Sequence, residues 1–241
     1  MQDSAFRVQR SLVATLVRQW LALRYRVLSR RYNRLVLEQI DGVPLVVLPQ
    51  VFNPVLLRTG AFLARTVAAL PLLPGADVLD LGAGSGVGAV FAARRGAHVI
   101  AVDINPEAVR CARINALLNH LEDVIEVRQG DLFAPVTGKQ FDLVVFNPPF
   151  YRGRPQRPLD HAWRGEDVFE RFTAGLAAQL KPAGQALLIL SSDGDGQELL
   201  AGLHDAGFQR EVVAQQDLRN EILTAYRVIP CRPHTMTPEA A

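Results

Sequence analysis

From residue 56 onward, short apolar runs alternate with longer stretches in which apolar residues recur at helical spacing. The short runs predict strands at 77–81, 99–102, 125–129, 143–146 and 186–191. The longer stretches predict helices at 56–70, 86–95, 106–118, 167–180 and 196–206. Apolar strands separated by amphipathic helices form a parallel sheet covered on both faces, so the sequence predicts an α/β fold. The runs 209–214 and 222–228 predict an antiparallel pair at one edge.

The first fifty residues follow a different pattern. Residues 11–31 carry apolar side chains at the spacing of one helix face, with arginines off that stripe. Two β-rich runs, 35–40 and 43–48, flank Asp41-Gly42, a dipeptide that favours a hairpin turn. We therefore expect a basic helix and hairpin cap over 1–50, a main domain over 51–230 and a flexible tail over 231–241.

Composition limits the class of protein. Apolar residues make up 49% and charged residues 21% of the 241 residues, which is typical of a soluble domain, and the net charge is only +2. Residues 1–45 nevertheless hold eight arginines against three acidic residues. These arginines could contact nucleic-acid phosphates or could form a solvated helix face. Two cysteines, histidines without ligand spacing, and no signal peptide or membrane-spanning run predict a cytoplasmic protein without a metal site.

A glycine-rich turn follows the strand at 77–81. It reads Asp80-Leu81-Gly82-Ala83-Gly84-Ser85-Gly86, and glycines at such a turn let a ligand approach the backbone. The carboxylate of Asp80 suits a cationic or ammonium-bearing ligand better than a pyrophosphate. The spacing places Val87 where a dinucleotide fingerprint has its third glycine, which disfavours a nicotinamide-dependent oxidoreductase.

Acidic residues also end the next two strands. Asp103 stands where a carboxylate can accept both hydroxyls of a ribose, although it could instead cap the helix that opens at Pro106. Asp131 could accept from an adenine amino group, with Leu132 or Phe133 beside the ring, or it could be an ordinary turn residue.

A rigid tetrapeptide, Asn147-Pro148-Pro149-Phe150, follows the run 141–146. The prolines fix the backbone and remove two donors, so the strand end presents mainly the Asn147 side-chain oxygen and the Pro148 carbonyl. Two rigid acceptors suit a planar –NH2 group, and Phe150 can lie against its flat face. The alternative is a purely structural role, in which the prolines stiffen a turn and the phenylalanine is buried.

Taken in order, these motifs resemble the class I S-adenosylmethionine-dependent methyltransferases, and among them the HemK, or release-factor glutamine methyltransferase, family. The resemblance implies a Rossmann-like fold with a seven-stranded, mostly parallel sheet, a catalytic domain over 51–230 and S-adenosyl-L-methionine at the C-terminal strand ends. It implies catalytic roles for Asn147, Pro148, Pro149 and Phe150. It implies cofactor binding by Thr59, Asp80, Gly82, Ala83, Gly84, Gly86, Asp103, Ile104, Asp131, Leu132 and Asn147. Tyr151 and Trp163 would belong to a substrate loop.

The identity of the methyl acceptor stays open at this point. A glutamine side chain of a release factor or ribosomal protein and the exocyclic amine of adenine in rRNA or tRNA both present a planar –NH2 group. The loop around Trp163 is similar to that of HemK relatives and favours a protein, whereas the arginine-rich cap favours RNA. A non-catalytic S-adenosylmethionine-binding module is the third reading, and the sequence leaves the oligomeric state open.

Overall fold

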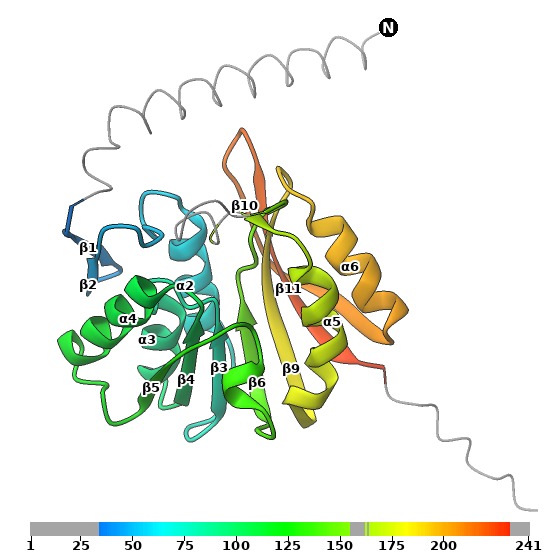
Figure 1. Cartoon of the computed structure of the whole chain (residues 1–241), viewed down its shortest axis with the longest axis horizontal. Helices are drawn as coiled ribbons and strands as arrows, with labels where there is room; N and C mark the ends of the chain where they lie inside the picture. The colour runs from blue at the N-terminus through cyan, green and yellow to red at the C-terminus, as the bar shows by residue number, and fades with distance from the viewer. Residues whose placement is uncertain (1–33, 155–161, 163, 232–241) are drawn as a thin grey trace, which may run out of the picture.

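The computed structural model describes residues 34–154, 162 and 164–231. The expected helix at 11–31, Trp163 and all of the tail beyond Cys231 lie outside the described residues. The described chain folds around one seven-stranded sheet with helices on both faces (Figure 1).

The central sheet has the strand order β10-β11-β9-β6-β3-β4-β5. Its strands are β3 (Asp77–Leu81), β4 (His98–Asp103), β5 (Ile125–Gln129), β6 (Phe141–Phe146), β9 (Leu180–Ser191), β10 (Phe208–Asp217) and β11 (Ile222–Pro230). The first five run parallel, and β11 pairs antiparallel with both β9 and β10. The predicted parallel sheet with an antiparallel edge pair is therefore confirmed.

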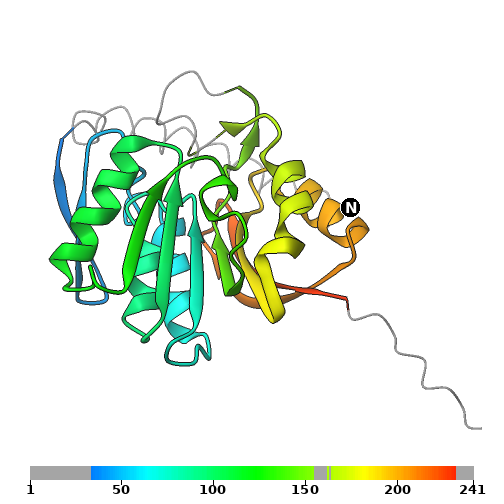
Figure 2. The same cartoon turned by 60° about the horizontal axis from the view of Figure 1, so that its bottom comes forward.

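Helices cover both faces of this sheet, as Figures 1 and 2 show. They are α2 (Thr59–Ala69), α3 (Val87–Ala93), α4 (Pro106–Leu118), α5 (Val168–Gln179) and α6 (Gly196–Asp205). Successive strand side chains point to opposite faces, so Val78 packs with α2, α3 and α4, whereas Leu79 packs with α5 and α6. The two apolar layers hold the strand ends in fixed positions relative to one another.

Helices α2, α3 and α5 begin later than the apolar pattern predicts, and for α2 and α3 the backbone conformation gives the reason. α2 begins at Thr59 rather than near residue 56, because Arg58 has a left-handed φ of 62° and interrupts helical geometry. α3 begins at Val87 because Gly86, with φ of 76°, ends the glycine turn. Both starts lie beside the cavity described below.

A hairpin of β1 (Val36–Ile40) and β2 (Val43–Val47) precedes α2, as the Asp41-Gly42 dipeptide predicts. Both turn residues have positive φ, 47° and 85°, which is typical of a two-residue hairpin turn. The hairpin packs on α4, where Asn115 is fully buried. Its side-chain oxygen accepts from the Val46 amide at 2.7 Å, and its amide nitrogen donates to the carbonyl oxygens of Val46 and Ser85 at 2.7 and 2.8 Å.

Three short elements have no periodic signal in the sequence. These are the 3-10 helix η1 (Ala134–Val136) and the parallel two-residue strands β7 (Tyr151–Arg152) and β8 (Arg164–Gly165). Strands β7 and β8 bring the chain directly after the Asn147 tetrapeptide beside Arg164.

Candidate functional site

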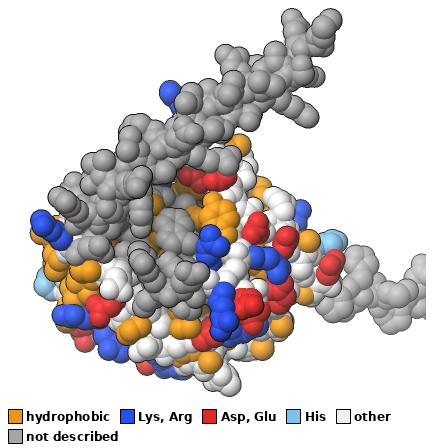
Figure 3. All heavy atoms as spheres, turned by 45° about the horizontal axis from the view of Figure 1, so that its top comes forward, with side chains coloured by type: hydrophobic (Ala, Val, Ile, Leu, Met, Phe, Trp, Pro, Cys, Tyr) orange, Lys and Arg blue, Asp and Glu red, His pale blue; other side chains and the backbone are white. Residues whose placement is uncertain are grey.

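A cavity lies at the carboxyl ends of β3, β4, β5 and β6. The chain steps from β3 outward to β4 and β5 and then returns to pair β6 with β3, so the connections diverge between β3 and β6. Ligands of open α/β sheets bind at such a switch point. Figure 3 views the molecule with this end turned forward, and there hydrophobic side chains lie among acidic and basic ones.

The cavity gathers most of the side chains that the sequence singles out. Ten of them line it: Asp80, Gly82, Ala83, Gly84, Asp103, Ile104, Asp131, Leu132, Asn147 and Pro149. Their motifs are separated by up to about seventy residues in the chain, and only the parallel strand order brings them to one edge.

The glycine turn forms the floor of the cavity. Gly82 and Gly84 have φ values of 63° and 56°, which side-chain-bearing residues rarely adopt. A Cβ atom on Gly84 would meet no atom within 4 Å, so open space lies over the backbone there. The turn is tied to β4, because Ala83 N donates to the Val102 carbonyl at 3.0 Å and Gly84 N donates to Asp103 Oδ2 at 2.8 Å. A ligand can therefore approach the main chain closely.

Asp80 lies beneath this turn and is only 3% exposed. Its Oδ2 accepts from the Ala89 amide at 2.7 Å, and a Cβ on Gly88 would lie 2.8 Å from its Oδ1. Burial raises the pKa of Asp80 to about 7, partly offset by the Ala89 hydrogen bond and reinforced by the nearby Asp103 carboxylate. A cationic group bound in the cavity would favour the ionised form.

Asp103 ends β4 and organises the adjoining backbone. Its Oδ1 accepts from Asn105 N and its Oδ2 from Gly84 N, both at 2.8 Å. The alternative role in capping α4 belongs to Asn105, whose side chain accepts from Glu107 N at 3.0 Å. Each carboxylate oxygen can accept more than one hydrogen bond, so Asp103 is suited to receive ribose hydroxyls while it holds the turn.

The third acidic residue, Asp131, is ion-paired. Arg171 of α5 donates from Nη2 to Asp131 Oδ2 at 2.7 Å, a contact between residues forty positions apart that no local pattern signals. Of the two residues after it, Leu132 lines the cavity with a positive φ of 47°, whereas Phe133 stacks on Phe172 with ring centroids 5.6 Å apart. Leu132 is therefore the residue that can border a bound ring.

Asn147 has the most informative environment in the cavity. Its side-chain Oδ1 is inaccessible to solvent and has no hydrogen-bond partner in the described structure. A buried oxygen without a donor costs about 1–3 kcal/mol, so such an atom marks a place for a missing donor. Pro149 also lines the cavity, whereas Pro148 and Phe150 line a smaller neighbouring hollow with Phe169.

Several other expected site residues lie beside the cavity without lining it. Thr59 is 1% exposed, and its Oγ1 lacks a hydrogen-bond partner among the described residues. Gly86 packs on α4, since a Cβ there would lie 2.9 Å from Ala112 Cβ. The hydroxyl of Tyr151 donates to Asp193 Oδ2 at 3.4 Å, and Trp163 is outside the described residues.

Several residues outside the predicted site complete the lining. Phe52, Pro54 and Gly60 come from the segment before α2 and from its first turn, and Ala162 and Arg164 come from the chain after the tetrapeptide. The positions of these side chains depend on how each segment turns back over the sheet.

The residues of the cavity fit an S-adenosyl group with a cationic end. The open glycine turn leaves room for a ligand, the acidic side chains at the strand ends favour positive charge and ribose hydroxyls, and the unpaired Asn147 oxygen awaits a donor. Among the described residues, no group of three or more His, Cys, Asp or Glu side chains could hold a metal ion. No helix in the described part of the chain is long and apolar enough to cross a membrane.

Comparison with known proteins shows which family the chain belongs to. Residues 44–218 match the family model described as the methyltransferase small domain. The chain is 30% identical over 202 residues to a Methanocaldococcus jannaschii protein assigned provisionally as a protein N5-glutamine methyltransferase, covering 79% of this chain and 98% of that protein. It is 32% identical over 168 residues to a release factor glutamine methyltransferase of Cereibacter sphaeroides, covering 63% of this chain and 60% of that protein.

Solved structures share the fold. The tRNA m1G37 methyltransferase of M. jannaschii superposes with a TM-score of 0.60 at 20% sequence identity, covering 83% of this chain and 58% of that one. This likeness agrees with the Rossmann-like sheet expected from the sequence.

Proposed function

We propose that this chain, which belongs to the methyltransferase small domain family and is an S-adenosylmethionine-dependent methyltransferase, methylates the side-chain amide nitrogen of a glutamine residue in a protein. The observation that carries the proposal is the Oδ1 of Asn147, a residue that lines the cavity, because this solvent-inaccessible oxygen has no hydrogen-bond partner among the described residues. Two relatives named as glutamine methyltransferases support the same acceptor.

The cofactor would be held by the glycine turn and by the acidic side chains Asp80, Asp103 and Asp131. When bound, S-adenosylmethionine supplies a methyl group on a positively charged sulfur. The carboxylates would favour that charge, and Asp103 would accept from the ribose. Leu132 would contact the apolar face of the adenine.

The tetrapeptide would position the acceptor. An amide nitrogen is a poor nucleophile because its lone pair is delocalised into the carbonyl group. Asn147 Oδ1 and the Pro148 carbonyl would accept its two hydrogens, fix the plane of the amide and stabilise the positive charge that develops on nitrogen. Correct orientation of the two reactants can contribute about 7–11 kcal/mol to lowering the barrier. The nitrogen would form a bond to the methyl carbon as the sulfur–methyl bond breaks. The sulfur would keep that electron pair and leave as neutral S-adenosylhomocysteine, and the nitrogen would then lose one proton to solvent.

Asn147→Ala tests the role of this oxygen. We expect kcat to fall about 10²–10³-fold, because the variant loses an acceptor that acts on the developing charge, while the affinity for S-adenosylmethionine changes little. The matched control is Asn119→Ala, at the residue that follows α4 and outside the cavity lining. Normal turnover by Asn147→Ala would exclude the acceptor role.

The acceptor itself can be found with methyl-labelled S-adenosylmethionine and an extract from cells that lack the protein. The labelled products are divided by protease and nuclease digestion, with Asn147→Ala as the blank. The proposal predicts label that is released by protease. Label released by nuclease would instead favour an adenine in rRNA or tRNA, and cofactor binding without label in either pool would favour a non-catalytic module.

We propose a cytoplasmic location for this activity. Cys111 and Cys231 are both free thiols, which suits a reducing compartment.

A further inference from the structure

A covering segment, residues 50–60, follows β2, includes the first two residues of α2 and forms part of the cavity wall. Phe52, Pro54 and Gly60 of this segment line the cavity. Its first residue is held by Asn105, which donates from Nδ2 to the Gln50 carbonyl at 3.0 Å. Its end folds back tightly, since a Cβ on Gly60 would lie 2.4 Å from Pro54 Cβ. The segment therefore closes over the cavity from the side of α2.

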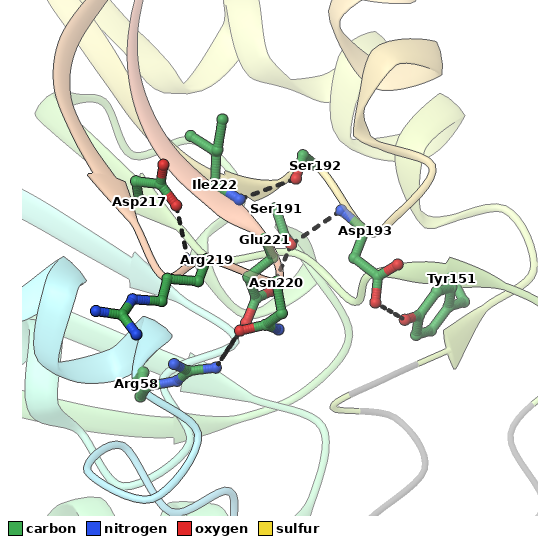
Figure 4. A network of polar contacts seen from close by, with 10 residues as sticks. All are labelled: Arg58, Tyr151, Ser191, Ser192, Asp193, Asp217, Arg219, Asn220, Glu221 and Ile222. Atoms are coloured by element: carbon green, nitrogen blue, oxygen red, sulfur yellow. Dashed lines mark hydrogen bonds and ion pairs between the residues drawn. The ribbon is translucent and has the colours of Figure 1, made fainter. Parts of the chain in front are cut away.

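Arg58 connects this segment to a distant part of the chain. Its Nη2 donates to Asn220 Oδ1 at 3.1 Å and lies 3.4 Å from Glu221 Oε1, both in the turn between β10 and β11 (Figure 4). The backbone of Arg58 is left-handed, with φ of 62°. A side-chain-bearing residue keeps this conformation only where the surroundings hold it, and functional sites collect such residues.

Glu221 continues the contact toward β9. Its side chain is 15% exposed, and its second oxygen, Oε2, accepts from the Ser191 hydroxyl at 2.6 Å. Ser191 Oγ in turn accepts from Asp193 N at 3.1 Å (Figure 4). A mostly buried carboxylate needs its partners, so this position is sensitive to the loss of Arg58.

The loop after β9 contacts the acceptor tetrapeptide. Asp195 N donates to the Phe150 carbonyl at 2.9 Å, and a Cβ on Gly194 would lie 2.6 Å from that same oxygen. The Tyr151 hydroxyl donates to Asp193 Oδ2 (Figure 4). A continuous series of contacts thus runs from the covering segment, through Arg58 and Glu221, to the tetrapeptide.

We infer that Arg58 and Glu221 are a positioning pair that holds the covering segment over the cofactor and fixes it relative to the tetrapeptide. The consequence for acceptor placement rests on the proposed role of Asn147, whereas the effect on the cofactor does not. Without the pair, cofactor binding must itself order the covering segment. The free energy of that ordering is then subtracted from the binding free energy, so the affinity for the cofactor falls.

Isothermal titration with S-adenosylhomocysteine tests the pair without any acceptor. We expect Arg58→Gln and Glu221→Gln each to weaken binding about fivefold or more, and the double variant to be no weaker than either single variant. The matched control is Arg65→Gln, which breaks an ion pair of Arg65 with Asp41, 3.0 Å long and remote from the cavity. Unchanged affinity in the single variants, or additive losses in the double variant, would overturn the inference.

Amide hydrogen exchange of the same proteins tests the link to the tetrapeptide. Arg58→Gln should speed exchange in peptides covering both 51–60 and 147–152, whereas Arg65→Gln should affect neither. Faster exchange confined to 51–60 would contradict the link. Neither measurement requires a methyl acceptor, so failure here and failure of the glutamine proposal are separate results.

Discussion

At the scale of single residues, the polar side chains of Asn147 and Asp80 determine what the cavity can bind. Asn147 keeps an oxygen that has no donor among the described residues, and Asp80 keeps a carboxyl group whose pKa lies near neutrality. Both features raise the free energy of the folded protein without ligand. A planar –NH2 group would satisfy the Asn147 oxygen, and a cation would stabilise the ionised form of Asp80. Gly88 belongs to this arrangement, because any side chain there would displace the Asp80 carboxyl.

The Asp80 pKa predicts a pH-dependent affinity. S-adenosylmethionine brings positive charge and therefore binds better when Asp80 is ionised, so the dissociation constant should fall as pH rises from about 6 to 8 through the pKa of about 7. Asp80→Asn should bind more weakly and lose this dependence. Titration calorimetry in buffers of different ionisation enthalpy would detect the released proton, and a flat profile for the unaltered protein would rule out this role of Asp80.

The same shift affects folding stability with a defined sign. The folded protein binds the Asp80 proton more tightly than the unfolded chain does, since the pKa rises from 3.8 to about 7. Stability therefore decreases as pH rises through that interval, and above it the full cost of ionising Asp80 is present in the unliganded protein.

At the scale of elements, the hairpin and α4 are joined by a single buried amide. Asn115 pairs with both backbone groups of Val46 and with the Ser85 carbonyl, so it links the hairpin, the glycine turn and α4. Cys111, one helical turn earlier, is also buried against the Val46 carbonyl. The pKa of its thiol is raised to about 11 by burial, which keeps it protonated as a packing residue.

Asn115→Ala should destabilise the protein by about 3 kcal/mol, because the Val46 amide and the Ser85 carbonyl lose the bond to Asn115 and the Val46 carbonyl keeps only the Cys111 thiol. Urea unfolding measures the change. Asn119→Ala, at the C-cap residue that follows the helix, is the control. It should cost about 1 kcal/mol or less, since the Asn119 side chain is partly exposed and donates to the carbonyls of Pro44 and Asn115. Equal losses in the two variants would contradict the structural role of Asn115.

At the scale of the whole molecule, the sheet order brings together what the chain separates. The glycine turn, Asp103 and the tetrapeptide lie close together because β3, β4 and β6 run parallel on either side of the switch point. The apolar alternation was sufficient to predict β3, β5 and α4 with their observed bounds. In these elements the apolar residues recur at the period of a strand or a helix, so their bounds can be predicted from local sequence alone.

The parts that sequence reasoning missed depend on contacts between distant segments. The β7–β8 pair has two residues per strand and therefore shows no period. The Arg171–Asp131 and Arg58–Glu221 pairs each join residues far apart in sequence, and their geometry follows from helix and turn positions. Phe52 lines the cavity because the covering segment folds back over it, which no local pattern specifies.

The most direct test of the central claim is the chemical identity of the methylated group. Extract macromolecules labelled from methyl-labelled S-adenosylmethionine would be hydrolysed in acid, and the volatile amines would be collected. Methylation of a glutamine amide predicts labelled methylamine in the volatile fraction, because hydrolysis of the amide leaves the methyl group on nitrogen. Label recovered in a methylated adenine, or in an amino acid that survives hydrolysis, would contradict the account.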